Sequence, residues 1–159
     1  MKFTIDSRSL AETVQWGRKL AGILTGGDVV CLYGQLGAGK TSFTQGVGRG
    51  LELDESVVSP TFTLIHAYDL PFVRRRAARF IHMDLYRLGT VEEAEQIGVD
   101  DCQQEDAIVL IEWPESALPL LDADRLELTI EGCGDQPRRL TFQSAAEAWR
   151  QRLAEGDIP

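Results

Sequence analysis

Positions 34–41 read GQLGAGKT and fit the pattern G-x-x-x-x-G-K-[ST]. In this pattern, glycines let successive backbone amides turn toward one point without Cβ clashes. Lys40 can then reach the β- and γ-phosphates of a nucleotide, and the Thr41 hydroxyl can ligate Mg²⁺. The pattern therefore predicts a loop that binds a nucleoside triphosphate together with Mg²⁺. The residues expected to hold the nucleotide here are Gly34, Gly37, Ala38, Gly39, Lys40, Thr41 and Ser42.

The residues around this loop have the strand–loop–helix context that it requires. Positions 28–33 form a short apolar run rich in strand formers, entered from a Gly-Gly turn. After Thr41, the spacing of Phe43 and Val47 predicts a helix that ends near Gly48 or Gly50. This context favours a phosphate site over the alternative, a glycine-rich turn that binds nothing.

Two acids follow predicted strands and can complete the site. Glu112 follows five apolar residues, the pattern of an acid that sits beside Mg²⁺, and Asp84 ends a strand predicted over 79–83. A nucleotide site in an open α/β sheet lies outside the carboxyl ends of the strands, so both acids can approach Thr41. We expect Glu112 and Thr41 on the metal and Asp84 orienting the attacking water, although each acid alone can also be a helix cap or a surface charge. The expected catalytic residues are Lys40, Asp84 and Glu112.

Further residues have both a functional and an ordinary interpretation. Thr61 follows Pro60 and can sense the γ-phosphate, or it can bond its own backbone in a turn. Trp113 can stack on a base or a partner, or it can simply pack beside its proline. His66 and His82 lack a set of metal-ligand partners and are interpreted as ordinary strand residues. The segment at 6–9 and the turn at 132–135 are possible walls for a base.

The order of the elements predicts an α/β fold. Strands are expected at 2–5, 28–33, 62–68, 79–83, 107–111, 126–130 and 139–142, and helices behind Ser9 and Thr41 and at 91–97 and 144–153. Positions 70–78 are expected to form an irregular loop. Alternating strands and helices followed by a late hairpin predict a P-loop NTPase fold, with a mostly parallel central sheet flanked by helices and a C-terminal antiparallel hairpin.

The composition predicts a globular domain and argues against a membrane-spanning or nucleic-acid-binding protein. The 159 residues, 43% hydrophobic and 26% charged, are expected to form a single domain over 1–159 with no membrane span. Three cysteines without a CxxC motif and no visible secretory signal fit a reducing cytoplasm, and each thiol is expected in the core as a small hydrophobic residue. The net charge of −9 argues against independent binding of nucleic acid. The arginines at 74–76 and at 138–139 are interpreted as a solvated loop and a charged strand edge, with a small RNA-contacting patch as the alternative.

Four segments together resemble the bacterial TsaE family, also called YjeE. They are GQLGAGKT at 34–41, SPTFTL at 59–64, HMDLYRL at 82–88 and IEWP at 111–114, and their order and spacing span most of the chain. The chain departs from the family at Gln35, where aspartate is common, and at Phe62 and Met83. The last three segments narrow the resemblance from a superfamily to this family.

The resemblance implies a P-loop ATPase with ATP and Mg²⁺ as cofactors. It implies a role in forming N6-threonylcarbamoyladenosine (t6A) in tRNAs that read A-starting codons, together with the TsaD and TsaB proteins and with tRNA only indirectly. It also implies phosphate and Mg²⁺ roles for Lys40 and Thr41, a second metal role for Glu112, importance for Asp84 and Trp113, and a switch-like segment at 59–61.

Two other functions remain open on sequence alone. A small-molecule kinase needs a lid and arginines that clamp a second substrate, and the arginines at 74–76 can serve. A non-catalytic module can use ATP to order a docking face. A GTPase is less favoured, because the sequence has no N-K-x-D motif for guanine.

Overall fold

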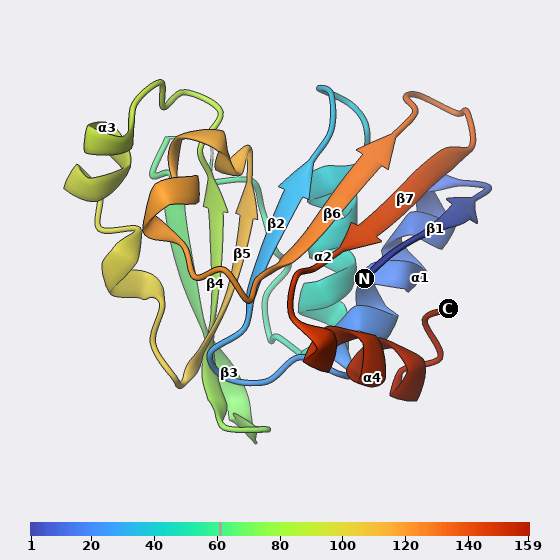
Figure 1. The fold of residues 1–159 in the computed structure, drawn as a ribbon, viewed down its shortest axis with the longest axis horizontal. Coiled ribbons are helices and arrows are strands. Elements are labelled where there is room, and N and C mark those ends of the chain that lie inside the picture. The colour runs from blue at the N-terminus through green and yellow to red at the C-terminus, as the bar shows by residue number, and fades with distance from the viewer. Residues whose placement is uncertain (61) are drawn as a thin grey trace.

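A computed structural model describes residues 1–60 and 62–159 and contains a seven-stranded sheet in the order β1-β7-β6-β2-β5-β4-β3 (Figure 1). The strands are β1 (Lys2–Ser7), β2 (Val29–Tyr33), β3 (Ile65–Arg74), β4 (Ala77–Asp84), β5 (Ala107–Glu112), β6 (Leu126–Glu131) and β7 (Arg138–Gln143). The α-helices are α1 (Leu10–Ala21), α2 (Lys40–Gly50), α3 (Val91–Gln96) and α4 (Glu147–Glu155), and the 3-10 helices are η1 (Asp100–Cys102), η2 (Pro114–Ser116) and η3 (Leu118–Leu120).

The predicted α/β architecture is confirmed. The central strands β6, β2, β5 and β4 pair in parallel, whereas β3, β7 and β1 pair antiparallel at the two margins. Strands β6 and β7 form the expected C-terminal hairpin. Because the central strands run in one direction, their carboxyl ends meet at one edge of the sheet.

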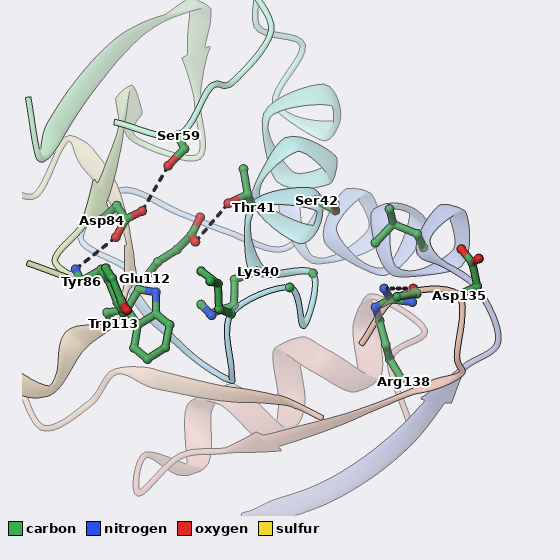
Figure 2. Close-up of a pocket in the computed structure, with 15 residues that line it drawn as sticks. Lys40, Thr41, Ser42, Ser59, Asp84, Tyr86, Glu112, Trp113, Asp135 and Arg138 are labelled. Atoms are coloured by element: carbon green, nitrogen blue, oxygen red, sulfur yellow. Dashed lines mark hydrogen bonds between the residues drawn. The ribbon is translucent and has the colours of Figure 1, made fainter. Parts of the chain in front are cut away.

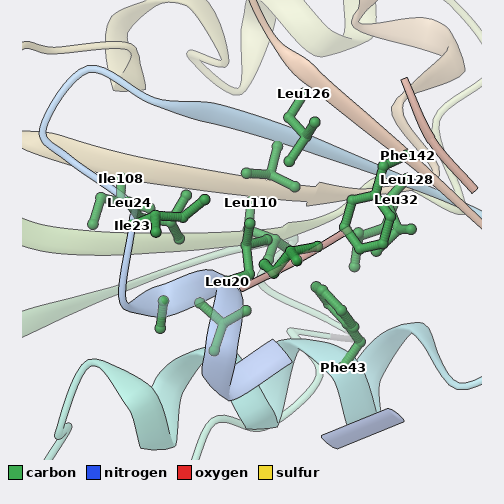
Figure 3. Packing of buried hydrophobic residues seen from close by; sticks show 14 of the residues in the cluster. Leu20, Ile23, Leu24, Leu32, Phe43, Ile108, Leu110, Leu126, Leu128 and Phe142 are labelled. Carbon is green, nitrogen blue, oxygen red and sulfur yellow. The ribbon is translucent and has the colours of Figure 1, made fainter. Parts of the chain in front are cut away.

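The side chains of β5 divide between two hydrophobic clusters, one on each face of the sheet. Ile108 and Leu110 belong to the cluster that α1, α2 and α4 cover, part of which is drawn in Figure 3. Val109 and Ile111 belong to the cluster under α3 and the 3-10 helices. Side chains alternate along a strand, so Glu112 shares its face with Leu110 and projects on the side of α2.

Helices α1 and α2 pack with their backbones in close approach. A Cβ atom added at Gly17 would lie 2.1 Å from the Phe43 carbonyl oxygen, and one added at Gly46 would lie 2.1 Å from the Val14 carbonyl oxygen. Both neighbours are main-chain atoms, which cannot rotate away. Only glycine therefore fits at these two positions, through which α1 and α2 pack directly against each other.

Gly46→Ala is expected to lower the free energy of unfolding by about 1–3 kcal/mol, because the new methyl group forces the two helices apart. Thermal or urea denaturation measures this change. Gly89→Ala is the matched control, since the nearest atom to a Cβ there is 3.8 Å away, at the end of the Glu93 side chain. Equal stability of the two variants would contradict the close helix contact.

The expected irregular loop at 70–78 is wrong. Strand β3 continues to Arg74, and β4 begins at Ala77. The intervening turn is made by Arg75 and Arg76, which have φ angles of 45° and 67°. Two successive residues in the left-handed region suit a tight hairpin, but glycine and asparagine usually fill those positions, so the sequence carried no turn signal. Pro71 is tolerated because β3 lies at the sheet margin.

The helix starts follow their predicted caps. Ser9 accepts the amide of Glu12, while the Glu12 carboxylate accepts the amide of Arg8, one residue before the cap. Thr90 and Glu93 form a complete capping box at α3. The amides of Gly89 and Thr90 lower the pKa of Glu93.

The three cysteines differ in environment. Cys31 is buried in β2, and burial raises the pKa of its thiol to about 12, as expected for a small core residue. Cys102 is half-buried and Cys133 is exposed, so the expectation of a core position is wrong for Cys133. Within residues 1–60 and 62–159, no helix is long and apolar enough to cross a membrane.

Candidate nucleotide-binding site

The loop at 34–41 connects β2 to α2, as predicted. Gly34 has a φ of 149° and a Cβ there would lie 2.4 Å from the Ile130 carbonyl oxygen, so this position excludes a side chain. Gly39 is the N-cap of α2 with a φ of 108°. No side chain in the described part of the chain caps this helix start. Its first amides are therefore available to an anion at the positive end of the helix dipole.

A pocket of about 600 Å³ opens beside this loop at the carboxyl ends of the central strands (Figure 2). Most of the predicted site residues line it: Gly37, Gly39, Lys40, Thr41, Ser42, Asp84, Glu112 and Trp113. Gly34 and Ala38 belong to the loop but do not line the pocket. The pocket is completed by two further groups of residues. Ser59, Gly134 and Asp135 come from the predicted switch-like segment and from the turn named as a possible wall, whereas Leu10, Leu36, Tyr86 and Arg138 were not predicted to lie there.

The Lys40 ammonium lies at the mouth of the loop and is bonded to neutral groups. Lys40 is 5% exposed, and its Nζ donates to the carbonyls of Gly34 at 2.6 Å and Gln35 at 3.0 Å. Nζ also lies 4.1 Å from the centroid of the Trp113 ring. Burial lowers the pKa of Lys40, against the opposing effect of Glu112. A phosphate oxygen can replace these neutral partners without breaking an ion pair among the described residues.

Asp84 and Glu112 lie side by side at the ends of β4 and β5, where they are register partners. Glu112 is 2% exposed, and its Oε2 accepts the Thr41 hydroxyl at 3.2 Å. Asp84 is more open to solvent and accepts the Ser59 hydroxyl and the Tyr86 amide, each at 3.1 Å. The structure therefore brings both predicted acids and Thr41 to one wall of the pocket.

This donor set fits Mg²⁺. Hydroxyl and carboxylate oxygens are the ligands that Mg²⁺ prefers, and Mg²⁺ is usually held by one or two carboxylates plus phosphates and water. Among the described residues, no cluster of three or more His, Cys, Asp or Glu side chains forms an all-protein metal cage. Thr41 and Glu112, with Asp84 nearby, are the residues that would hold the ion.

Trp113 and Tyr86 form an aromatic wall beside Lys40. Trp113 has a φ of 56°, which turns the chain sharply after Glu112. Its ring lies 4.8 Å from that of Tyr86, measured between centroids. Thr61 lies outside the described residues. Ser59, two residues earlier, is bonded to Asp84, so the predicted switch-like segment starts at the acid wall.

Arg138 lines the pocket, although the sequence did not predict it as a site residue. The expectation of a charged strand edge is wrong for Arg138, which is 3% exposed. Its guanidinium donates to the carbonyls of Ala38, Gln136 and Gly134 at 2.8, 3.0 and 2.7 Å. It thereby ties the turn between β6 and β7 to the phosphate loop. This turn supplies Gly134 and Asp135 to the pocket, as expected for a wall, whereas the segment at 6–9 does not line it.

His82 was also missed. It was interpreted as an ordinary strand residue, but it is fully buried and its Nε2 lies 2.8 Å from Glu112 Oε1. The alternation of β4 places His82 on the same face as Phe80 and Asp84, but the contact with Glu112 also requires that β4 and β5 are neighbours. His66 instead stacks on Tyr68, away from the residues that line the pocket.

Comparisons with known proteins point to one family. The family model described as "Threonylcarbamoyl adenosine biosynthesis protein TsaE" matches residues 7–140. The protein named tRNA threonylcarbamoyladenosine biosynthesis protein TsaE from Treponema pallidum is 35% identical over 135 residues, 85% of this chain and 96% of its own. Its namesake from Streptomyces coelicolor is 37% identical over 142 residues, 84% and 90% of the two chains.

A solved structure shares this fold over nearly the whole chain. The crystal structure of Bacillus subtilis YdiB superposes with a TM-score of 0.78 at 27% identity, covering 99% of this chain and 95% of that one. The family match spans the phosphate loop and both strand-end acids. The chain therefore belongs to the threonylcarbamoyl adenosine biosynthesis protein TsaE family.

Proposed function

We propose that this protein is an ATPase that hydrolyses ATP to ADP and phosphate, with Mg²⁺, in the biosynthesis of t6A in tRNA. The names of its relatives support the pathway. The observation that carries the chemistry is the convergence of Lys40, Thr41, Asp84 and Glu112 on one pocket. This convergence matches what phosphoryl transfer needs, which is positioning and charge stabilisation around the terminal phosphate.

Each residue has a distinct task in this proposal. The amides at the start of α2 and the Lys40 ammonium bind the β- and γ-phosphates. Thr41 and Glu112 hold Mg²⁺, which when bound neutralises charge that develops on the phosphate oxygens. Asp84 is more exposed than Glu112 and lies beside it, so it orients the attacking water. Trp113 and Tyr86 close one side of the pocket against bulk solvent.

We further propose that hydrolysis is slow in the isolated protein and becomes efficient with TsaD and TsaB in the cytoplasm. The net charge of −9 supports tRNA contact through those partners rather than directly. The hairpin turn at Arg75 and Arg76 joins β3 to β4 at the end of the sheet that lies away from the pocket (Figure 1). Arg76 there donates to the carbonyl of Gly26, just before β2 begins. The turn is badly placed to clamp a second substrate, which favours an ATPase over a small-molecule kinase.

The proposal is tested by measuring phosphate release from ATP by this protein alone and with purified TsaB and TsaD. We expect little release alone and clear Mg²⁺-dependent release in the complex. Absence of release in both conditions, with ATP still bound, would favour the non-catalytic module. Transfer of phosphate to a metabolite without any partner would favour the kinase.

A further inference from the structure

We propose that His82 is a positioning residue that sets the orientation of the Glu112 carboxylate toward Mg²⁺, an inference that rests on the proposed Mg²⁺-dependent ATP hydrolysis. His82 lies on β4 between β3 and β5, and its register partner on β5 is Leu110, two residues before Glu112. It is fully buried, and its Nε2 lies 2.8 Å from Glu112 Oε1. It is absent from the described pocket lining, so it can act on the site only through Glu112.

The surroundings of the ring assign its tautomer. Nδ1 of His82 is buried and has no hydrogen-bond partner among the described residues. A proton on Nδ1 would be a buried donor without an acceptor, which costs more free energy than a bare ring nitrogen there. The proton that His82 donates is therefore placed on Nε2, which donates to Glu112 Oε1.

The other donors to Glu112 cannot replace this bond. The Thr44 hydroxyl has a single proton, and it lies 3.0 Å from the Lys40 carbonyl oxygen but 3.3 Å from Glu112 Oε1. The Thr41 hydroxyl, at 3.2 Å, contacts the other oxygen, Oε2. His82 is thus the shortest contact to Oε1 and has no other described acceptor to satisfy.

This arrangement divides the tasks of the two carboxylate oxygens. His82 fixes Oε1 in the core, and Oε2 is left facing Thr41, which is the other proposed metal residue. Hydrogen-bonded partners behind a ligand typically change metal affinity or activity about 10–100-fold when removed. Loss of the His82 donor should therefore raise the Mg²⁺ concentration that ATP hydrolysis requires, while the phosphate loop stays intact.

The test uses three substitutions that separate the hydrogen bond from packing. His82→Phe keeps a ring without a donor, His82→Gln places an amide donor near the position of Nε2, and His82→Asn is polar but shorter. Calorimetric ATP titrations at a series of Mg²⁺ concentrations, and without Mg²⁺, are compared with the Mg²⁺ dependence of hydrolysis in the TsaB–TsaD complex. Thermal unfolding establishes that each variant is folded.

We expect the Phe and Asn variants to need at least about tenfold more Mg²⁺ than wild type for half-maximal ATP hydrolysis. Their ATP affinity without Mg²⁺ should stay within about twofold of wild type. The Gln variant should recover to within about threefold. In a Glu112→Gln background, His82→Phe should cause no further change. The inference is overturned if the Phe and Asn variants both need no more Mg²⁺ than wild type. It is also overturned if these variants lose as much ATP affinity without Mg²⁺ as with it, or if His82→Phe lowers activity further in the Glu112→Gln background. Failure of the wild-type protein to bind ATP would instead refute the proposed function itself.

Discussion

Lys40→Ala is expected to abolish measurable ATP binding. The substitution removes the only side-chain cation at positions 34–41, so the loop then offers the phosphates its main-chain amides without a charged side chain. Charge-assisted hydrogen bonds of this kind contribute about 1.5–3 kcal/mol each, so losing contacts to two phosphates lowers affinity by roughly a hundredfold or more. Isothermal titration calorimetry with ATP and Mg²⁺ measures the loss.

A second substitution separates the charge from the packing of the lysine stem. Lys40→Met keeps the apolar stem and should lose binding as severely as Lys40→Ala, with a thermal unfolding transition close to that of wild type. Lys19→Ala is the surface control, since Lys19 pairs with an exposed Asp157 and should leave affinity unchanged. Wild-type ATP affinity in either Lys40 variant would refute the assignment of the site.

Glu112→Ala is expected to keep part of the ATP affinity and to lose Mg²⁺-dependent hydrolysis. The phosphate loop and Lys40 remain, but one of the two proposed protein ligands of the metal is gone. Metal stabilisation of transition-state charge amounts to several kcal/mol, which corresponds to a loss of roughly a hundred- to a thousandfold in kcat. Phosphate release in the TsaB–TsaD complex, followed across Mg²⁺ concentrations, measures it.

The matched control for this loss is Glu105→Ala, an exposed acid just before the opposite end of β5, which should hydrolyse ATP at the wild-type rate. Glu112→Ala also leaves the buried His82 donor without its acceptor, which can lower the stability of the fold. Glu112→Gln removes the charge but keeps an oxygen that accepts from His82, so it separates the loss of the metal ligand from a loss of folding. If Glu112→Ala hydrolysed ATP as fast as wild type, Asp84 would become the preferred metal residue.

The candidate residues that follow from local sequence lie together at one pocket. The loop at 34–41 is a contiguous motif, and the run before Glu112 is apolar because β5 is buried on both faces. Asp84 and Glu112 could be placed at strand ends without knowing which strands are neighbours. Their shared edge then followed from the parallel order of an α/β sheet.

The parts that were missed depend on pairing between distant segments or on unusual turns. The bond from His82 to Glu112 exists because β4 and β5 are neighbours, which no local pattern states. Arg138 looked like a surface charge, although it shares a face with the buried Leu140 and Phe142. The hairpin at Arg75 and Arg76 was missed because neither residue type signals a left-handed turn.

The central claim is that the main-chain amides at positions 34–41 and the Lys40 ammonium together capture the triphosphate of ATP. Its most direct test is a calorimetric titration of the folded wild-type protein with ATP and Mg²⁺ at millimolar concentration. The claim predicts saturable heat that disappears in Lys40→Ala. The absence of any binding heat from folded wild-type protein would contradict it.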